Sequence, residues 1–185
     1  MMNRQTASRP GSRIGLFGGT FNPIHNGHLQ MADKALKEYK LSKVYFIPCG
    51  IPPHKKIKDL LPAKLRYKLV KDAIKGKKYF KVLDIEVKKK KPCYTIDTVK
   101  TLVGTSRDWS LLYFLIGQDE FENLKTWNKP NELAKLVTFL VLPRSLKKIK
   151  PPKIKNLQWS PVHTKLIDIS STEIRRNIKP PHKPR

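Results

Sequence analysis

Apolar residues occur along the chain in short blocks, and the spacing within each block separates strands from helices. Continuous or β-branched apolar runs are typical of strands that are buried on both faces of a sheet. Such runs lie at Ile14–Phe17, Lys43–Pro48, Leu111–Ile116 and Val137–Leu142. Apolar residues three and four positions apart predict helices instead. These helices begin at Gly27 and at Pro62 and extend over Tyr94–Val103, Asp119–Trp127 and Asn131–Leu136.

Weaker patterns predict three further elements. Tyr79–Val87 alternates like an exposed strand, and Lys165–Ile169 predicts a last strand before a last helix at Ser171–Ile178. Because strands alternate with helices, we expect an α/β fold, a Rossmann-like doubly wound parallel sheet with helices on both faces. A chain of 185 residues fits one domain, so we expect a flexible extension over residues 1–13 and a single domain over residues 14–185.

Ligands of such sheets bind at the carboxyl ends of the strands, near the point where the strand order reverses. The segments that follow the predicted strands are therefore the candidates for a site. They are Gly18–His28, Cys49–Lys55, Gly117–Asp119, Pro143–Arg144 and Ser170–Arg175. We expect these five segments, which are scattered in the sequence, to meet at one edge of the sheet.

The charge balance points to anionic partners. The chain has 39 Lys and Arg against 14 Asp and Glu, a formal net charge of +25, and such an excess attracts nucleotides and other polyanions. Its two cysteines are too few for a disulfide framework. No apolar run approaches the length of about 18 residues that crosses a bilayer, and no signal peptide is visible. We therefore expect a cytoplasmic protein with no membrane partner.

The segment Gly18–His28 combines paired glycines with two histidines three positions apart, between a predicted strand and a predicted helix. Glycines let a backbone approach a ligand closely, and the start of a helix attracts anions through its N–H groups and its dipole. His25 and His28 could thus both face a phosphate. A tight turn with two incidental histidines is the plainer interpretation, and zinc binding lacks a third ligand at a suitable spacing.

The segment Ile169–Arg176 also has two compatible interpretations. Ser170 with Glu173 three residues later is a capping box that stabilises a helix start. The same helix start is an anion site, where hydroxyl groups and Arg175 could bind phosphate oxygens.

Taken together, five motifs resemble the HxGH nucleotidyltransferase superfamily, and within it the bacterial nicotinate-nucleotide adenylyltransferases. They are LFGGTFNPIHNGHL at 16–29, IPxxxPPHK at 47–55, YTIDTV at 94–99, FLIGQDEFENLKTW at 114–127 and ISSTEIR at 169–175. The resemblance covers nearly the whole chain, from Ile14 to Arg176. It implies a nucleotidyltransferase fold and transfer of the adenylyl group of ATP to nicotinate mononucleotide, giving nicotinate adenine dinucleotide and pyrophosphate for NAD biosynthesis.

The resemblance also assigns roles to individual residues. It implies catalytic roles for His25, His28 and Arg175. The residues that it places at ATP are Gly18, Gly19, Phe21, His25, His28, Gly117, Asp119, Arg144, Ser171, Thr172 and Arg175. The residues that it places at the mononucleotide are Thr20, His54, Lys55, Thr95, Asp119, Trp127 and Asn128. Mg²⁺ is expected on the ATP phosphates and no protein residue is assigned to a metal, while a homo-oligomer stays open.

Two alternatives remain at this point. Pantetheine-phosphate adenylyltransferases share the fold and both end motifs, but they usually have Thr in place of His25 and lack the IGQD…W and YTIDT segments. A basic nucleic-acid-binding module would explain the charge, and it predicts aromatic residues among the Lys runs. The runs Lys88–Lys91 and Lys147–Lys155 contain none, so we expect no specific nucleic-acid partner, only salt-sensitive association.

Overall fold

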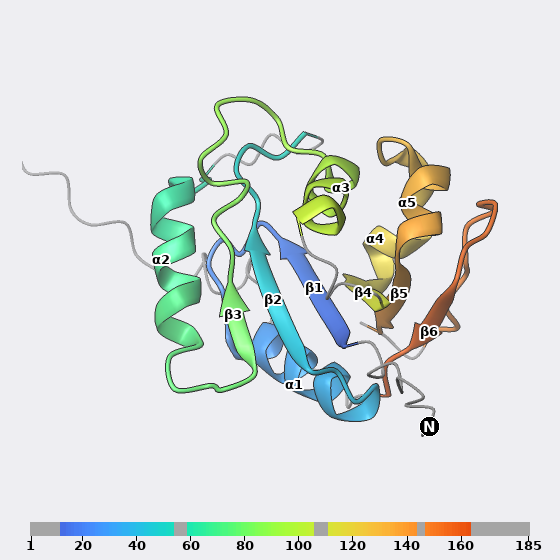
Figure 1. Ribbon diagram of the computed structural model, residues 1–185, viewed down its shortest axis with the longest axis horizontal. Coiled ribbons are helices and arrows are strands. Elements are labelled where there is room, and N and C mark those ends of the chain that lie inside the picture. The colour runs from blue at the N-terminus through green and yellow to red at the C-terminus, as the bar shows by residue number, and fades with distance from the viewer. Residues whose placement is uncertain (1–11, 54–58, 106–110, 144–146, 164–185) are drawn as a thin grey trace, which may run out of the picture.

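The computed structural model describes residues 12–53, 59–105, 111–143 and 147–163, and its strands form one parallel sheet (Figure 1). The strands are β1 (Arg13–Gly19), β2 (Lys43–Pro48), β3 (Phe80–Val82), β4 (Leu111–Gly117), β5 (Thr138–Leu142) and β6 (Trp159–Pro161). Their order across the sheet is β3-β2-β1-β4-β5-β6, and every neighbouring pair is parallel. This order is that of a doubly wound α/β sheet, so the predicted fold class is confirmed.

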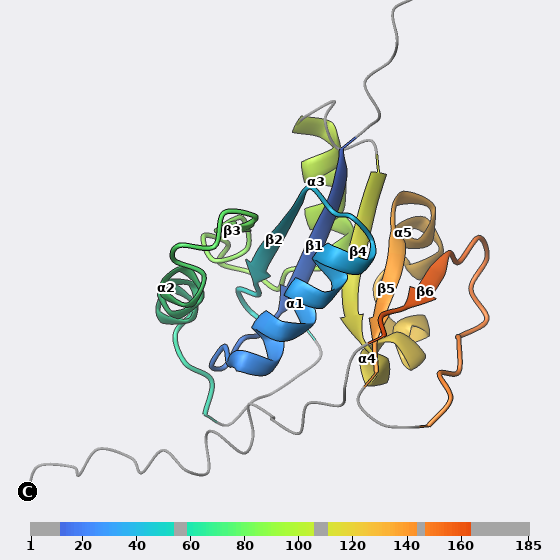
Figure 2. The same cartoon turned by 90° about the horizontal axis from the view of Figure 1, so that it is seen from below.

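Helices cover both faces of the sheet (Figure 2). They are α1 (Asn26–Glu38), α2 (Ala63–Ala73), α3 (Thr95–Thr105), α4 (Gln118–Glu122), the 3₁₀ helix η1 (Leu124–Thr126) and α5 (Pro130–Leu136). Apolar residues of α1 and α2 belong to one buried cluster, and those of α3, α4, η1 and α5 belong to another. The two clusters lie on opposite faces of the sheet because side chains alternate along each strand. In β4, for example, Phe114 and Ile116 join the second cluster while Leu115 joins the first.

One strand prediction needs correction, and one strand was not predicted. The predicted strand Tyr79–Val87 is wrong beyond β3, because the chain leaves the ladder after the Leu83 N–H donates to the Phe46 carbonyl at 2.9 Å and then turns. Strand β6 was not predicted, because it has only three residues and ends on Pro161. An edge strand tolerates a proline, which lacks the N–H of a ladder. The predicted elements Lys165–Ile169 and Ser171–Ile178 lie outside the described residues.

Helix boundaries differ only slightly from the predictions. Asn123 divides the predicted helix Asp119–Trp127 into α4 and η1. Helix α3 begins at Thr95 and extends to Thr105, two residues past the predicted end. Most of the predicted extension, residues 1–11, lies outside the described part of the chain. Among the residues that the structure describes, no helix has the length and apolar character needed to cross a membrane.

Candidate active site

The described parts of the predicted site segments, at residues 18–28, 49–53, 117–119 and 143, follow strands at the carboxyl edge of the sheet. Strands β1 and β4 are neighbours in this sheet. From β1 the chain turns through α1 to β2 on one side, and after β4 it continues through α4 and α5 to β5 on the other side. The strand order therefore reverses between β1 and β4, which is the place where doubly wound sheets bind ligands. Gly18 and Gly19 end β1, and Gly117 ends β4.

The turn after β1 is shaped by close packing as much as by backbone freedom. A Cβ atom on Gly19 would lie 3.0 Å from the ring of Phe21, and one on Gly18 would lie 3.0 Å from the ring of Phe114. Phe21 itself has a positive φ of 45° and is buried. Its ring lies 5.1 Å from that of His28 and 5.5 Å from that of Phe17, each edge-on. Phe21 thus packs against the His28 ring, a contact that its place in the motif did not indicate.

His25 and His28 form one unit at the N-terminus of α1. His25 is the N-cap, with extended backbone (φ −146°, ψ 169°), and its N–H donates to Nδ1 of His28 at 3.3 Å. The two ring centroids are 3.7 Å apart. An imidazole that accepts through Nδ1 carries its proton on Nε2 when it is neutral, so His28 takes the tautomer that donates from Nε2. The first turn of α1 contains no acidic residue, so the helix dipole and the histidines together favour an anion.

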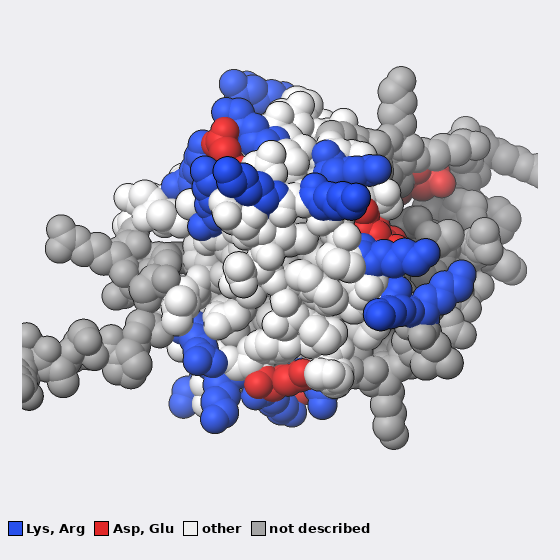
Figure 3. Space-filling view, turned by 90° about the vertical axis from the view of Figure 1, so that its right-hand side faces the viewer, with Lys and Arg blue, Asp and Glu red and all other residues white. Residues whose placement is uncertain are grey.

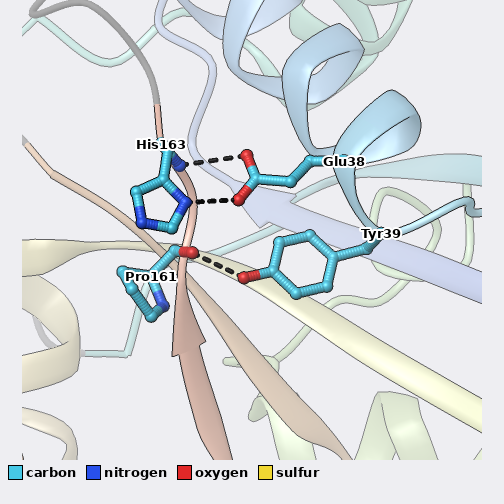
Figure 4. Close-up of polar contacts among 4 residues, drawn as sticks. All are labelled: Glu38, Tyr39, Pro161 and His163. Atoms are coloured by element: carbon cyan, nitrogen blue, oxygen red, sulfur yellow. Dashed lines mark hydrogen bonds and ion pairs between the residues drawn. The ribbon is translucent and has the colours of Figure 1, made fainter.

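The far end of α1 is also anchored (Figure 4). The Glu38 carboxylate accepts the His163 N–H at 3.0 Å and contacts its Nδ1 at 2.6 Å, and the Tyr39 hydroxyl donates to the Pro161 carbonyl at 2.5 Å. These contacts join α1 to the end of β6. The helix that begins at the histidine pair is therefore held at both ends, and this limits how far the pair can shift.

Trp127 lies beside β4, near its carboxyl end. It follows η1, is half-buried, and stands edge-on to Phe114 with the ring centroids 6.0 Å apart. Phe114 is the same side chain that faces Gly18 at the end of β1. Trp127 therefore lies one aromatic ring away from the β1 turn, with part of its surface open to solvent.

Comparisons with known proteins agree with this geometry. A family model described as cytidylyltransferase-like matches residues 16–177. The probable nicotinate-nucleotide adenylyltransferase of Lactococcus lactis subsp. lactis is 39% identical over 172 residues, which cover 91% of this chain and 86% of that protein. The protein of the same name from Caldicellulosiruptor bescii is 40% identical over 173 residues, covering 90% and 86%. The chain is a member of the nicotinate-nucleotide adenylyltransferase family.

The alignment with another family member, from Desulfotalea psychrophila, is shorter. It is 40% identical over 136 residues, which cover 72% of this chain and 64% of that protein. A solved structure of Plasmodium falciparum nicotinic acid mononucleotide adenylyltransferase complexed with NaAD superposes with a TM-score of 0.72, covering 89% of this chain and 83% of that chain. Its sequence identity is 19%, so this likeness supports the fold. These relatives favour the nicotinate enzymes over the pantetheine-phosphate alternative.

The structure describes only part of the residue set that the family resemblance assigned. Gly18, Gly19, Thr20, Phe21, His25, His28, Gly117 and Asp119 lie at the ends of β1 and β4 or in the turns and helices that follow them. Thr95 starts α3, and the bridge between Ile51 and Pro92 brings the segment before it alongside the loop after β2. His54, Lys55, Arg144, Ser171, Thr172 and Arg175 lie outside the described residues.

A polar cluster beside the β4–α4 turn was missed by sequence reasoning. The Gln118 amide donates to the Glu122 carboxylate at 2.9 Å and to the Lys147 carbonyl at 3.3 Å. Glu122 also accepts the Lys150 N–H at 3.1 Å, and these hydrogen bonds lower the pKa of Glu122. The cluster ties the segment that begins at Lys147 to the helix that carries Asp119. The local signal for it was the four-residue spacing of Gln118 and Glu122 at the start of a predicted helix.

Basic side chains occur in separate groups on the side of the molecule that carries β6 and α5 (Figure 3). They surround a mostly uncharged centre, and a few acidic groups lie between them. One of the ion pairs that the structure describes joins Lys100 and Glu132 at 2.6 Å. This side of the described structure thus shows no continuous basic track of the kind that follows a nucleic-acid backbone.

We predict that Trp127→Ala raises the KM for the pyridine mononucleotide about tenfold and leaves the KM for ATP nearly unchanged. A stacked ring contact exists equally in the ground state and the transition state, so its loss affects KM and spares kcat. Trp159→Ala is the matched control, because Trp159 packs on Phe121 at 5.3 Å in strand β6. Steady-state kinetics with each substrate varied in turn check the prediction. An equal rise in both KM values would make Trp127 a structural residue.

Glu86 is a buried acid beneath the loop after β2. Its carboxylate accepts the Thr98 hydroxyl at 2.8 Å, and burial raises its pKa above the ordinary value of 4.5. Burial and the nearby Glu86 also raise the pKa of the Cys49 thiol to about 12. Cys49 and Cys93 are both free cysteines, and at neutral pH Cys49 is a protonated thiol that lines the loop rather than a nucleophile.

Glu86 gives a pH-dependent prediction. A raised carboxyl pKa means that the folded state binds this proton more tightly, so stability decreases as pH rises from about 4.5 through the raised value. Glu86→Gln keeps the acceptor for Thr98 and removes the charge, so its unfolding free energy relative to the unmodified chain should increase from about pH 4 to about pH 7. Urea unfolding across that range measures it. Glu132→Gln is the control of opposite sign, because the Lys100 hydrogen bond lowers the pKa of Glu132. Parallel stability curves for the Glu86→Gln variant and the unmodified chain would contradict the prediction.

Proposed function

We propose that this chain transfers the adenylyl group of ATP to nicotinate mononucleotide and releases pyrophosphate, forming nicotinate adenine dinucleotide. The observation that carries the proposal is the close pair of His25 and His28 at the N-terminus of α1, next to the end of β1. The pair occurs in a chain about 40% identical to curated relatives that are named probable nicotinate-nucleotide adenylyltransferases. A cytoplasmic location is part of the proposal, because ATP and pyridine nucleotides are its substrates.

The chemistry needs alignment more than it needs a base. A phosphate oxygen of the mononucleotide attacks the α-phosphorus of ATP, a new P–O bond forms, and the bond from the α-phosphorus to the bridging oxygen of pyrophosphate breaks. The attacking phosphate is already anionic at neutral pH, so no proton has to be removed. Holding the two anions in line can supply about 7–11 kcal/mol of the barrier.

Positive donors would stabilise the charge that develops on the transferring phosphoryl group and on the departing pyrophosphate. We assign this role to the Nε2–H of His28, to His25, and to Arg175 in the C-terminal motif. The N-terminal N–H groups of α1 contribute through the helix dipole. None of these groups has to change its covalent state during the reaction.

The remaining residues of the family set fall on two sides of this centre. We propose that Gly18, Gly19, Phe21, Gly117, Asp119, Arg144, Ser171 and Thr172 form the ATP side. Lys147 and Lys148 border an open hollow of about 560 Å³ beyond β5 and β6. Their ammonium groups would add positive charge on this side. On the mononucleotide side we propose Thr20, His54, Lys55, Thr95, Asp119, Trp127 and Asn128, with Trp127 stacking on the pyridine ring.

Magnesium is proposed as part of the ATP substrate. The described His, Cys, Asp and Glu side chains form no group of three that could hold a metal ion. Mg²⁺ usually keeps several waters and binds through substrate phosphates, and on ATP it would neutralise phosphate charge. The first turn of α1, beside the proposed phosphate site, contains no acidic residue, and this suits an ion that the substrate carries.

The test is a coupled pyrophosphate-release assay with ATP and three separate acceptors: nicotinate mononucleotide, nicotinamide mononucleotide and pantetheine phosphate. The proposal expects the highest kcat/KM with nicotinate mononucleotide and turnover that requires Mg²⁺. Preference for pantetheine phosphate, or no turnover with either pyridine nucleotide, would refute it. Light scattering of the same preparation would show whether the active form is a homo-oligomer.

A further inference from the structure

Arg66 lies in the first turns of α2, and its side chain is completely buried. All three nitrogens of its guanidinium group donate to backbone carbonyls. Nε donates to Leu61 at 2.9 Å, Nη1 to Thr20 at 2.6 Å and Nη2 to Gly50 at 2.8 Å. Burial lowers the pKa of Arg66, yet a guanidinium group remains charged in proteins. Burying a charged side chain costs free energy, and here the charge is balanced only by hydrogen bonds to three backbone carbonyls. We therefore ask what these three contacts do.

The carbonyls belong to loops that carry the candidate site. Thr20 lies in the turn between β1 and α1, which contains the histidine pair. Gly50 lies in the loop after β2, which leads to His54 and Lys55. Asn22, also buried, joins the same two loops: its amide donates to the Asp59 carbonyl at 3.0 Å and its oxygen accepts the Leu61 N–H at 2.9 Å.

Gly50 is held on its other side as well. A Cβ atom at this position would lie 2.3 Å from the Glu86 carbonyl oxygen, so only glycine fits. Glu86 is in turn bonded to Thr98 of α3, the helix that begins at Thr95. The Gly50 carbonyl is thus fixed between Arg66 and the segment that precedes α3.

A second path leads from Arg66 to His28. Thr20 is followed directly by Phe21, whose ring packs edge-on against His28 at 5.1 Å. Phe21 has a positive φ, which few residues other than glycine adopt, so this turn has few alternative conformations. A shift of the Thr20 carbonyl would therefore move Phe21 and, through it, the imidazole that we place at the phosphoryl group.

We propose that Arg66 is a positioning residue that sets the β1–α1 turn and the β2–α2 loop relative to each other, so that the phosphoryl-transfer centre and the mononucleotide site form together. It touches no substrate. The proposal rests on the function proposed above. Arginine suits the task because its planar fork presents several donors in fixed directions, which the single ammonium group of lysine does not.

The test is Arg66→Lys, which keeps the charge and can satisfy only part of the three contacts. We expect kcat to fall about 10- to 100-fold, as a displacement of about 1 Å would cause. We also expect the mononucleotide KM to rise several-fold, with a smaller change in the ATP KM. Both are measured at a temperature at which circular dichroism shows the variant fully folded.

Val70→Ala is the matched control. Val70 is one helical turn further along α2 and equally buried, but it packs in the apolar core. Its truncation should lower the urea concentration at the midpoint of unfolding and leave kcat and both KM values unchanged. If the two variants show the same kinetics at matched folded fractions, Arg66 is merely structural and the proposal is wrong.

A readout without turnover separates this proposal from the proposed function. Backbone amide exchange within residues 18–28 and 48–53 should speed up in Arg66→Lys and not in Val70→Ala, whatever substrate the enzyme uses. Unchanged exchange there refutes the positioning role even if the enzyme is active. If Arg66→Lys does not fold, Asn22→Ala replaces it, because Asn22 bonds the same two loops, and it must give the same pattern of exchange and KM.

Discussion

His28→Ala is expected to lower kcat at least about 100-fold, the usual cost of removing one donor to a transition-state oxyanion. The structure gives the reason. Nδ1 of His28 accepts from the His25 N–H, so Nε2 carries the hydrogen and can donate a hydrogen bond to a phosphoryl oxygen. The His28 ring packs against Phe21 at 5.1 Å and against the His25 ring at 3.7 Å, and these contacts fix the direction of its Nε2–H.

The effect on folding should be small by comparison. The alanine variant loses one hydrogen bond at the helix start, worth about 1 kcal/mol, and some ring contact. Gln30→Ala, an exposed change in the same helix, should keep full activity and stability. Pyrophosphate release and thermal unfolding are measured on both variants. Normal turnover of His28→Ala, or a loss of activity that merely follows unfolding, would remove His28 from the mechanism.

Sequence patterns predicted the parts of this molecule in which one local signal has one structural meaning. The apolar run at 111–116 became β4 within one residue, because a strand covered on both faces must be apolar throughout. Helix α1 begins at Asn26, one residue from the prediction, directly after the histidine that caps it. The convergence of β1 and β4 followed from the rule that parallel strands place their carboxyl ends on one edge.

What could not be predicted depends on partners that are distant in the sequence. Arg66 is one of 39 Lys and Arg residues, and its burial could not be predicted, because two of its three acceptors are the distant carbonyls of Thr20 and Gly50. The edge-on contact of Phe21 with His28 depends on the positive φ of Phe21, which no neighbouring residue in the sequence indicates. Glu86 lies in an alternating segment that predicts a strand, although its carboxylate is buried and accepts a hydrogen bond from Thr98 of α3. In each case the missing information is the tertiary contact itself.

The enzyme is expected to favour nicotinate over nicotinamide mononucleotide by roughly 5- to 150-fold in kcat/KM. The substrates differ by a carboxylate against a neutral amide on the same ring. N–H groups that converge on this substituent bind the anion well, whereas an amide turns its own NH₂ donor toward them and leaves groups unpaired, at about 1–3 kcal/mol each. The net charge of +25 also creates a positive electrostatic potential, which favours the nicotinate anion over the neutral amide.

The N–H of Asn128 is the group that we expect to face the substituent. Asn128 lies between η1 and α5, outside both helices, directly after Trp127. Asn128→Pro removes this N–H and suits the extended backbone of Trp127 (ψ 158°), while Asn128→Ala retains it. The proline variant should lose most of the preference and the alanine variant should keep it.

Ionic strength separates the two sources of this preference. Salt screens the long-range field over about 10 Å at 0.1 M, but it leaves a donor mismatch at close contact unchanged. The ratio of kcat/KM for the two mononucleotides should therefore narrow as salt is added and then level off well above one. A ratio that falls to one at high salt would assign the whole preference to net charge, and Asn128→Pro would then have no effect. Equal efficiencies at low salt would contradict the donor argument and the assignment to nicotinate together, because both terms are at their strongest there.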